Sequence, residues 1–165
     1  MPALLEPALL EPALLETVQA IGLVSCFALI GTSRIGACIR WLSLQGIVFG
    51  LVPVIANDHG LGLRVILLAG GNIALKGVIF PLVLLRLRAR TDYHREVEPF
   101  IGFVASILFG IVALAVSVWL ALALQPALRH APFLMLEAAI FLISIGLFII
   151  ISRRKALMQV IGYLV

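Results

Sequence analysis

The feature that most constrains this chain is a series of apolar stretches, each about as long as a helix that crosses a bilayer. A helix needs about 20 mostly apolar residues to span the hydrocarbon core of a membrane. Five such stretches and the beginning of a sixth cover approximately residues 14–32, 37–56, 65–85, 100–124, 134–151 and 156–165. Because a segment in lipid must satisfy its own backbone polar groups, we predict an all-α, polytopic transmembrane helix bundle with five spans plus the start of a sixth.

The composition leaves little of the chain for anything outside the membrane. Hydrophobic residues make up 63% of the 165 residues and charged residues only 12%, whereas a soluble domain is roughly half apolar and a quarter charged. The longest polar connection covers residues 86–99. The sequence shows no nucleophile paired with a base, no phosphate-binding loop and no metal-ligand cluster, so we predict no catalytic residue, no metal and no bound cofactor.

Positive residues are distributed unevenly between the connections, and this predicts an orientation. If the spans alternate in direction, nine basic residues lie on one side of the membrane: Arg34, Arg40, Arg86, Arg88, Arg90, Arg95, Arg153, Arg154 and Lys155. The opposite side carries Arg64 and Arg129. Because cytoplasmic loops carry an excess of lysine and arginine, we predict that the N-terminus is outside and that Arg153, Arg154 and Lys155 form a cytoplasmic basic turn.

The N-terminus contains an internal repeat ahead of the first span. The sequence Pro-Ala-Leu-Leu-Glu occurs at residues 2–6, 7–11 and 12–16. Each proline removes a backbone donor and crowds the preceding turn of a helix. We therefore predict an irregular or interfacial lead-in over residues 1–13, followed by a single transmembrane helical domain over residues 14–165.

Lys76 is the polar residue that most indicates a function. It is the twelfth of the 21 residues 65–85, and a charge at the centre of a span costs about 2.5–3.5 kcal/mol on insertion scales. Asn72 lies one turn earlier on the same helix face, and Pro81 frees the carbonyl of Gly77 from its helical bond. We interpret Lys76 and Asn72 as part of a proton or ion relay; the alternative is a lysine capped by carbonyls and lipid headgroups.

Two further polar residues lie in the spans. Gln45, in the second span, is either a third member of the relay or the donor of a hydrogen bond between helices. Glu137 lies near the outer end of the fifth span, where we expect a water-accessible, interfacial carboxylate.

The cysteines and histidines do not suggest a metal site. Cys26 and Cys38 fall in or beside apolar segments and are interpreted as packing residues. No pair of histidines has metal-ligand spacing, and all three fall in connections, where we expect them to be solvated: His59, His94 and His130.

Two segments carry a resemblance to a known family. The basic turn and the helix after it read Ser-Arg-Arg-Lys-Ala-Leu-Met-Gln-Val-Ile-Gly-Tyr-Leu-Val over residues 152–165, and residues 71–82 read Gly-Asn-Ile-Ala-Leu-Lys-Gly-Val-Ile-Phe-Pro-Leu. Both resemble the membrane subunit called hydrogenase-4 component E, in which a lysine precedes a proline by about five residues. More distantly, the first segment is similar to the K subunit of respiratory complex I and the C subunit of multisubunit sodium/proton antiporters.

The resemblance implies a role in a larger assembly. It suggests a non-catalytic membrane subunit of an energy-converting redox complex, related to group 4 hydrogenases or complex I, which contributes to proton or ion translocation through Lys76. Its partners would be the other membrane subunits of that assembly, in a bacterial or archaeal cytoplasmic membrane, with the redox centres in other chains. The alternatives are a small subunit of a multisubunit cation/proton antiporter, a self-contained small transporter or channel, and a structural membrane spacer.

The last ten residues carry one more expectation. A helix over residues 156–165 rises about 15 Å, roughly half the thickness of the hydrocarbon core. In the related families an Arg-Arg turn leads into a helix that soon presents an intramembrane glutamate. We therefore expect a continuation beyond Val165 that supplies a carboxylate for Lys76.

Overall fold

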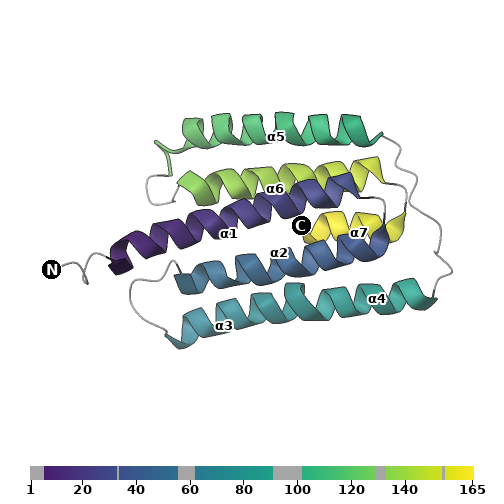
Figure 1. Cartoon of the computed structure of the whole chain (residues 1–165), viewed down its shortest axis with the longest axis horizontal. Helices are drawn as coiled ribbons and strands as arrows, with labels where there is room; N and C mark the ends of the chain where they lie inside the picture. The colour runs from purple at the N-terminus through teal and green to yellow at the C-terminus, as the bar shows by residue number, and fades with distance from the viewer. Residues whose placement is uncertain (1–5, 33, 56–61, 91–101, 129–132, 154) are drawn as a thin grey trace.

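A computed structural model of the chain describes residues 6–32, 34–55, 62–90, 102–128, 133–153 and 155–165, with side chains from Ala13 onward. The described elements are all helical and are labelled in Figure 1. In chain order they are α1 (Glu6–Gly31), α2 (Ile35–Ile55), α3 (Leu63–Asn72), the π-helical segment η1 (Ile73–Ile79), α4 (Phe80–Arg90), α5 (Phe103–Leu124), α6 (Phe133–Ser152) and α7 (Ala156–Leu164).

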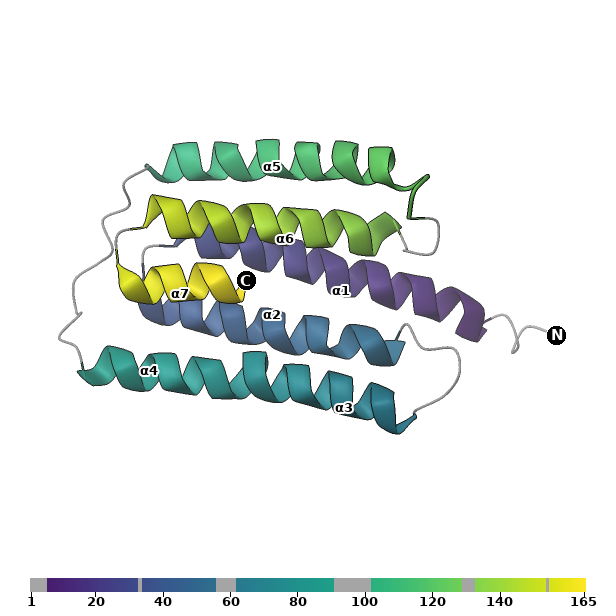
Figure 2. The ribbon, with the colours of Figure 1, turned by 180° about the vertical axis from the view of Figure 1, so that it is seen from behind.

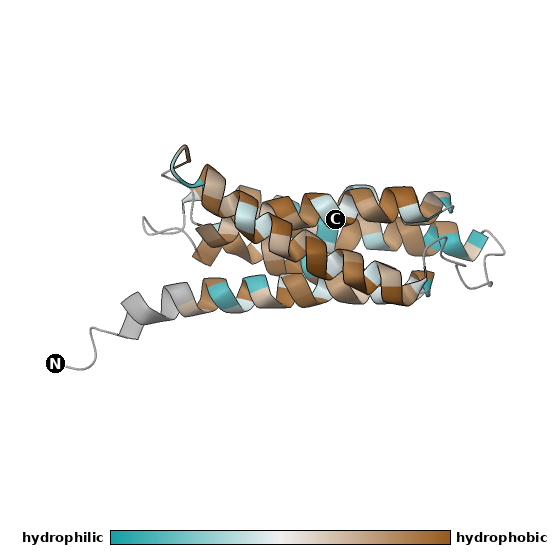
Figure 3. Ribbon diagram, turned by 90° about the horizontal axis from the view of Figure 1, so that it is seen from above, coloured by the Kyte–Doolittle hydropathy of each residue, from teal (hydrophilic) through white to brown (hydrophobic). Residues whose placement is uncertain are grey.

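Five helical segments are long and apolar enough to cross a membrane, which confirms the predicted fold class. They are α1 from Ala13, α2, the continuous 28-residue unit α3–η1–α4, α5 and α6. Apolar residues predominate along all of these helices (Figure 3). The chain is therefore a multi-pass membrane protein. The predicted start of the fourth span at residue 100 lies outside the described residues, and α5 begins at Phe103.

The spans lie side by side, with α5 at one edge of the bundle and α3–η1–α4 at the other (Figures 1 and 2). Helix α1 packs against α2, α5 and α6, and α2 packs against α1, α3–η1–α4 and α7. The short helix α7 folds back beside α6 and contacts α2 within the bundle. These contacts place α7 close to the middle of the structure, where Figure 1 shows the end of the chain.

The N-terminal repeat is more regular than the sequence predicted. Helix α1 begins at Glu6, so residues 6–13 are helical, and the interfacial position that the sequence also predicted for this segment remains a prediction. Pro7 is the second residue of this helix, where a backbone N–H has no intrahelical partner in any case. Only Pro12, further into the helix, removes a bond that the helix would otherwise make, and one lost bond does not stop it.

The buried apolar core lies in the half of the bundle that contains the end of α1, the start of α2 and the end of α6. Its largest fully buried side chains come from four helices: Phe141, Leu29, Ile30, Ile39, Leu42, Ile145, Ile149, Met158 and Ile161. Cys26 and Cys38 belong to this core, both 0% exposed and both free thiols. Their predicted role as packing residues is confirmed.

Most of the described basic side chains belong to the same end of the bundle as this core. Arg64 begins the third span at the opposite end, whereas the core end holds Arg34, Arg40, Arg86, Arg88, Arg90, Arg153 and Lys155. The predicted Arg95, Arg129 and Arg154 lie outside the described residues. This distribution agrees with the charge count from the sequence, and the outside location of the N-terminus remains a prediction of the positive-inside rule.

Two glycines bring the backbones of α6 and α7 into contact. A Cβ atom added to Gly146 would lie 2.6 Å from the carbonyl oxygen of Gly162, and one added to Gly162 would lie 2.8 Å from the carbonyl oxygen of Gly146. Real Cβ atoms do not approach a backbone atom this closely, so α7 can hold its position only while both residues lack a side chain.

We expect Gly146→Ala to lower the free energy of unfolding by about 1–3 kcal/mol, because the added methyl group forces α6 and α7 apart. Gly71→Ala is the matched control, since no atom lies within 4 Å of a Cβ at Gly71; there the gain in helix propensity should stabilise the protein by about 0.5–1 kcal/mol. Denaturation in mixed detergent micelles measures both changes. Equal effects of the two substitutions would contradict the observed contact.

Candidate functional site

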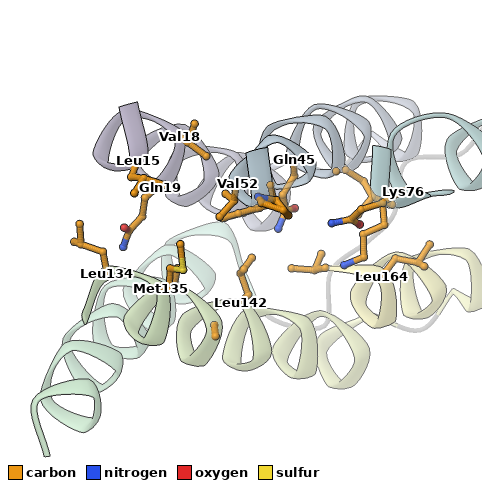
Figure 4. Close-up of a pocket in the computed structure, with 18 residues that line it drawn as sticks. Leu15, Val18, Gln19, Gln45, Val52, Lys76, Leu134, Met135, Leu142 and Leu164 are labelled. Carbon is orange, nitrogen blue, oxygen red and sulfur yellow. The ribbon is translucent and has the colours of Figure 1, made fainter. Parts of the chain in front are cut away.

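A cavity of about 360 Å³ lies within the bundle, between α1, α2, the α3–η1 unit, α6 and α7. This volume is in the range of small-molecule sites, and such sites typically combine apolar walls with a few converging polar groups. The wall is mostly apolar, and its four polar side chains are Gln19, Gln45, Asn72 and Lys76. The three residues predicted from the sequence as a relay therefore line one cavity, and Gln45 and Lys76 are labelled in Figure 4.

Lys76 lies at the centre of a π-helical segment, which the sequence did not predict. The segment covers Ile73–Ile79, and after it the N–H of Phe80 bonds to the carbonyl of Leu75, five residues earlier. Pro81 follows directly, and its ring clashes with the carbonyl four residues before it in a regular α-helix. A wider turn before the proline relieves that clash. Short π-helical segments inside α-helices are rare and are frequently found at functional sites.

The carbonyl of Gly77 has a partner that the sequence interpretation did not name. Its oxygen accepts a hydrogen bond from the hydroxyl of Ser43 in α2, with an Oγ–O distance of 2.5 Å. The prediction that Pro81 leaves this carbonyl available to another group therefore agrees with the structure. The group that uses it is a serine of the neighbouring helix.

Helix α2 also presses directly on the backbone at Lys76. A Cβ atom added to Gly46 would lie 2.7 Å from the carbonyl carbon of Lys76 and 2.9 Å from the nitrogen of Gly77. Together with the bond from Ser43, this contact holds the backbone of η1 against α2. The side chain of Lys76 is half-buried and extends from this fixed position into the cavity (Figure 4).

Gln45 is buried at the cavity wall, with 3% of its surface exposed. Its amide nitrogen donates to the sulfur of Cys26 in α1 at 3.8 Å, and its Oε1 atom has no hydrogen-bond partner among the described residues. Sulfur is a weak acceptor. The weak bond to α1 agrees with the predicted hydrogen bond between helices, and the relay role of Gln45 remains a prediction.

No charged partner of Lys76 is present among the described side chains. The two carboxylates whose side chains are described are Glu16, which is exposed, and Glu137, and neither lines the cavity. Glu137 is only 8% exposed, so the prediction of a water-accessible carboxylate at this position is wrong. It lies one helical turn before Phe141, whose ring packs against Phe27 of α1.

The basic turn contains a buried arginine. Arg153 is 2% exposed, and its Nη2 atom donates to the carbonyl oxygen of Ile30 at 3.1 Å. This carbonyl belongs to the last turn of α1, where a helix leaves its carbonyls without internal partners and favours positive charge. The sequence placed Arg153 in the turn but missed this contact. Arg154 lies outside the described residues, and Lys155 precedes the first residue of α7.

The remaining sequence interpretations concern metals and histidines. His59, His94 and His130 lie outside the described residues. In the described part of the chain, no three His, Cys, Asp or Glu side chains are placed to hold a metal ion. Comparison with protein-family models, with curated proteins and with solved structures returns no match. The cavity and the residues on its wall are therefore the basis for a functional proposal.

Proposed function

We propose that this chain is a non-catalytic membrane subunit of an energy-converting redox complex, as its resemblance to hydrogenase-4 component E implies. In this proposal Lys76 takes part in the translocation of protons or another ion, and Asn72 and Gln45 assist it. The observation that carries the proposal is the position of the Lys76 ammonium group, which extends into a cavity without a charged partner among the described side chains.

The cost of burying a charge supports a role for this lysine. An ammonium group deep in a membrane protein is retained where it binds a substrate, pairs with another charge or carries protons. The amide groups of Asn72 and Gln45 share the cavity wall with Lys76 and can bind water beside it. A purely structural spacer would not need a cationic group at this position.

The proposal also requires other subunits. Neither described carboxylate side chain lines the cavity. Lys76 can instead pair with a carboxylate on a helix of another subunit, in the way that intramembrane charges usually pair. The outer faces of α3–η1–α4 and α5 carry exposed apolar side chains, which suit lipid or a membrane partner equally. By the resemblance, the location would be a bacterial or archaeal cytoplasmic membrane.

Purification from the native membrane tests this proposal. An affinity-tagged chain extracted in mild detergent should bring down several hydrophobic subunits together with a peripheral arm that contains iron–sulfur or nickel centres, detectable by mass spectrometry and metal analysis. Membrane subunits without such an arm would instead support the antiporter alternative. A folded, monodisperse chain that binds no other protein would contradict both. The Lys76→Ala variant is the control for assembly and should retain the same partners.

A further inference from the structure

The cavity is confined to one half of the bundle. Its wall includes Gln19 from the first half of the membrane-spanning part of α1, Val52 near the end of α2 and Met135 near the start of α6. Because α1 and α6 run in one direction and α2 in the other, these three positions lie at the same end of the molecule (Figure 1). This is the end at which α1 begins, away from the basic turn.

The cavity ends about halfway through the bundle, at Lys76. This residue is the fourteenth of the 28 residues from Leu63 to Arg90. Leu164 of α7 and Leu42 of α2 also line the cavity at this closed end.

The other half of the bundle is closely packed. Helix α7 is held against α6 by the contact between Gly146 and Gly162, and its Met158 and Ile161 side chains are 0% exposed. Ile39 of α2 and Ile149 of α6 are each 1% exposed at the same level. The buried polar atoms of this half that lack a partner, Ser152 Oγ and Arg153 Nη1, lie at its far end beside the basic turn. The buried apolar side chains between them and Lys76 offer no hydrogen-bond partners to a path of water.

We propose that the cavity is a one-sided water vestibule, which connects Lys76 to the side of the membrane where α1 begins and is closed on the other side by α7 and the core. A buried water needs two to four polar partners, and the polar side chains of the wall supply them at successive depths: Gln19 near the open end, then Gln45, then Lys76 (Figure 4).

The vestibule adds a direction of access to the proposed function. It rests on that proposed function for the identity of the transported ion. Under the predicted orientation, Lys76 exchanges protons with the outside, and passage to the cytoplasmic side requires either a movement of α7 or a group supplied by another subunit. The geometry of access can be measured without any transport assay, so the two proposals can fail separately.

Accessibility of introduced cysteines tests the vestibule in the assembled protein in its native membrane. The wall variants are Gln19→Cys, Val52→Cys and Lys76→Cys, each treated with a small, positively charged, membrane-impermeant methanethiosulfonate. Thiols that remain free are then counted under denaturing conditions by the gel shift of a polyethylene glycol maleimide. In all three variants we expect the reagent, when it is added on the side where α1 begins, to remove the part of the gel shift that is due to the introduced cysteine.

Three controls show from which side the reagent reacts and how much of the labelling comes from the native cysteines. The unmodified protein should retain the gel shift of its own thiols, because Cys26 and Cys38 are both 0% exposed. Ile149→Cys, in the packed half, should not react from either side, and Lys155→Cys, at the start of α7, should react only from the side opposite to the wall variants. Reaction of Lys76→Cys from the side of Lys155 would overturn the proposal.

A lipid tail in the cavity is the alternative that the apolar walls suggest. In that case the charged reagent would leave Val52→Cys and Lys76→Cys unmodified, while a small, uncharged maleimide that dissolves in lipid would modify them. This result would also overturn the vestibule, whatever the transport activity of the variants. Reaction of Gln19→Cys alone would place the water only at the mouth and would reject access to Lys76.

Discussion

Replacing Lys76 with alanine should abolish ion translocation coupled to the complex while the subunits still assemble. A positioned proton-transfer group contributes about 100- to 10,000-fold to the rate of the step that it serves, so coupled transport should fall to background. Loss of the side chain leaves the backbone contact with Gly46 and the hydrogen bond between Ser43 and Gly77 unchanged. Proton uptake into inverted vesicles, followed with a pH-sensitive dye, measures the effect, and co-purification measures assembly.

Lys76→Arg separates a proton carrier from a fixed positive charge. Arginine retains the charge but cannot be deprotonated under these conditions. If Lys76 releases a proton during turnover, the arginine variant should be as inactive as the alanine variant; if only the charge matters, arginine should restore transport. Arg64→Ala is the matched control, because Arg64 is an exposed cation of the same span and does not line the cavity. Unchanged coupled transport in Lys76→Ala would refute the relay.

The fold class could be predicted from the sequence because the bilayer permits few alternatives. Apolar stretches of spanning length must be helical when the chain is in lipid, and the predicted spans agree with the helices to within a few residues at most ends. The N-terminal repeat shows the limit of a local rule. The rule treats every proline as a helix breaker, whereas Pro7 lies in the first turn of α1, where a backbone donor has no intrahelical partner to lose.

The candidate site was predicted in part because mid-membrane polarity is costly wherever it occurs. Because a charge at mid-membrane is costly, the sequence alone identifies Lys76 as a candidate functional residue. Helix periodicity then predicts that Asn72 lies on the same helix face. The wider turn at Lys76 could not be predicted, because it depends on how the chain relieves the clash before Pro81. The contact between Gly46 and the backbone of Lys76 depends on the packing of two helices, and spacing in the sequence does not specify such a pairing.

Two buried charged side chains at the ends of α6 also depend on helix packing that the sequence does not specify. Glu137 and Arg153 lie near the two ends of one span, and hydropathy alone places both at the interface with water. Whether a residue near a helix end is exposed depends on its direction relative to neighbouring helices. In the structure α1 packs along α6, so Arg153 reaches the last turn of α1 and Glu137 is covered.

Arg153 should be needed for stability through its contact with α1. A hydrogen bond from a charged donor contributes about 1.5–3 kcal/mol, and removal of a buried side chain also leaves a cavity. The stabilisation from this hydrogen bond is partly offset by the cost of burying the Nη1 atom of Arg153, which has no partner in the described structure. Together these effects predict that Arg153→Ala lowers the free energy of unfolding by about 2–4 kcal/mol.

Two further variants show which part of the side chain is responsible. Methionine fills a similar volume without a charge, and replacement of a buried ion by an apolar residue is often neutral, so Arg153→Met should remain within about 1 kcal/mol of the native protein. Arg90→Ala, at an exposed position at the end of α4, should change stability by less than about 0.5 kcal/mol. Denaturation of the purified assembly in mixed micelles measures all three. If Arg153→Met is as destabilising as Arg153→Ala, the charged bond to the carbonyl of Ile30 dominates; if neither variant differs from Arg90→Ala, the buried contact does not stabilise the fold.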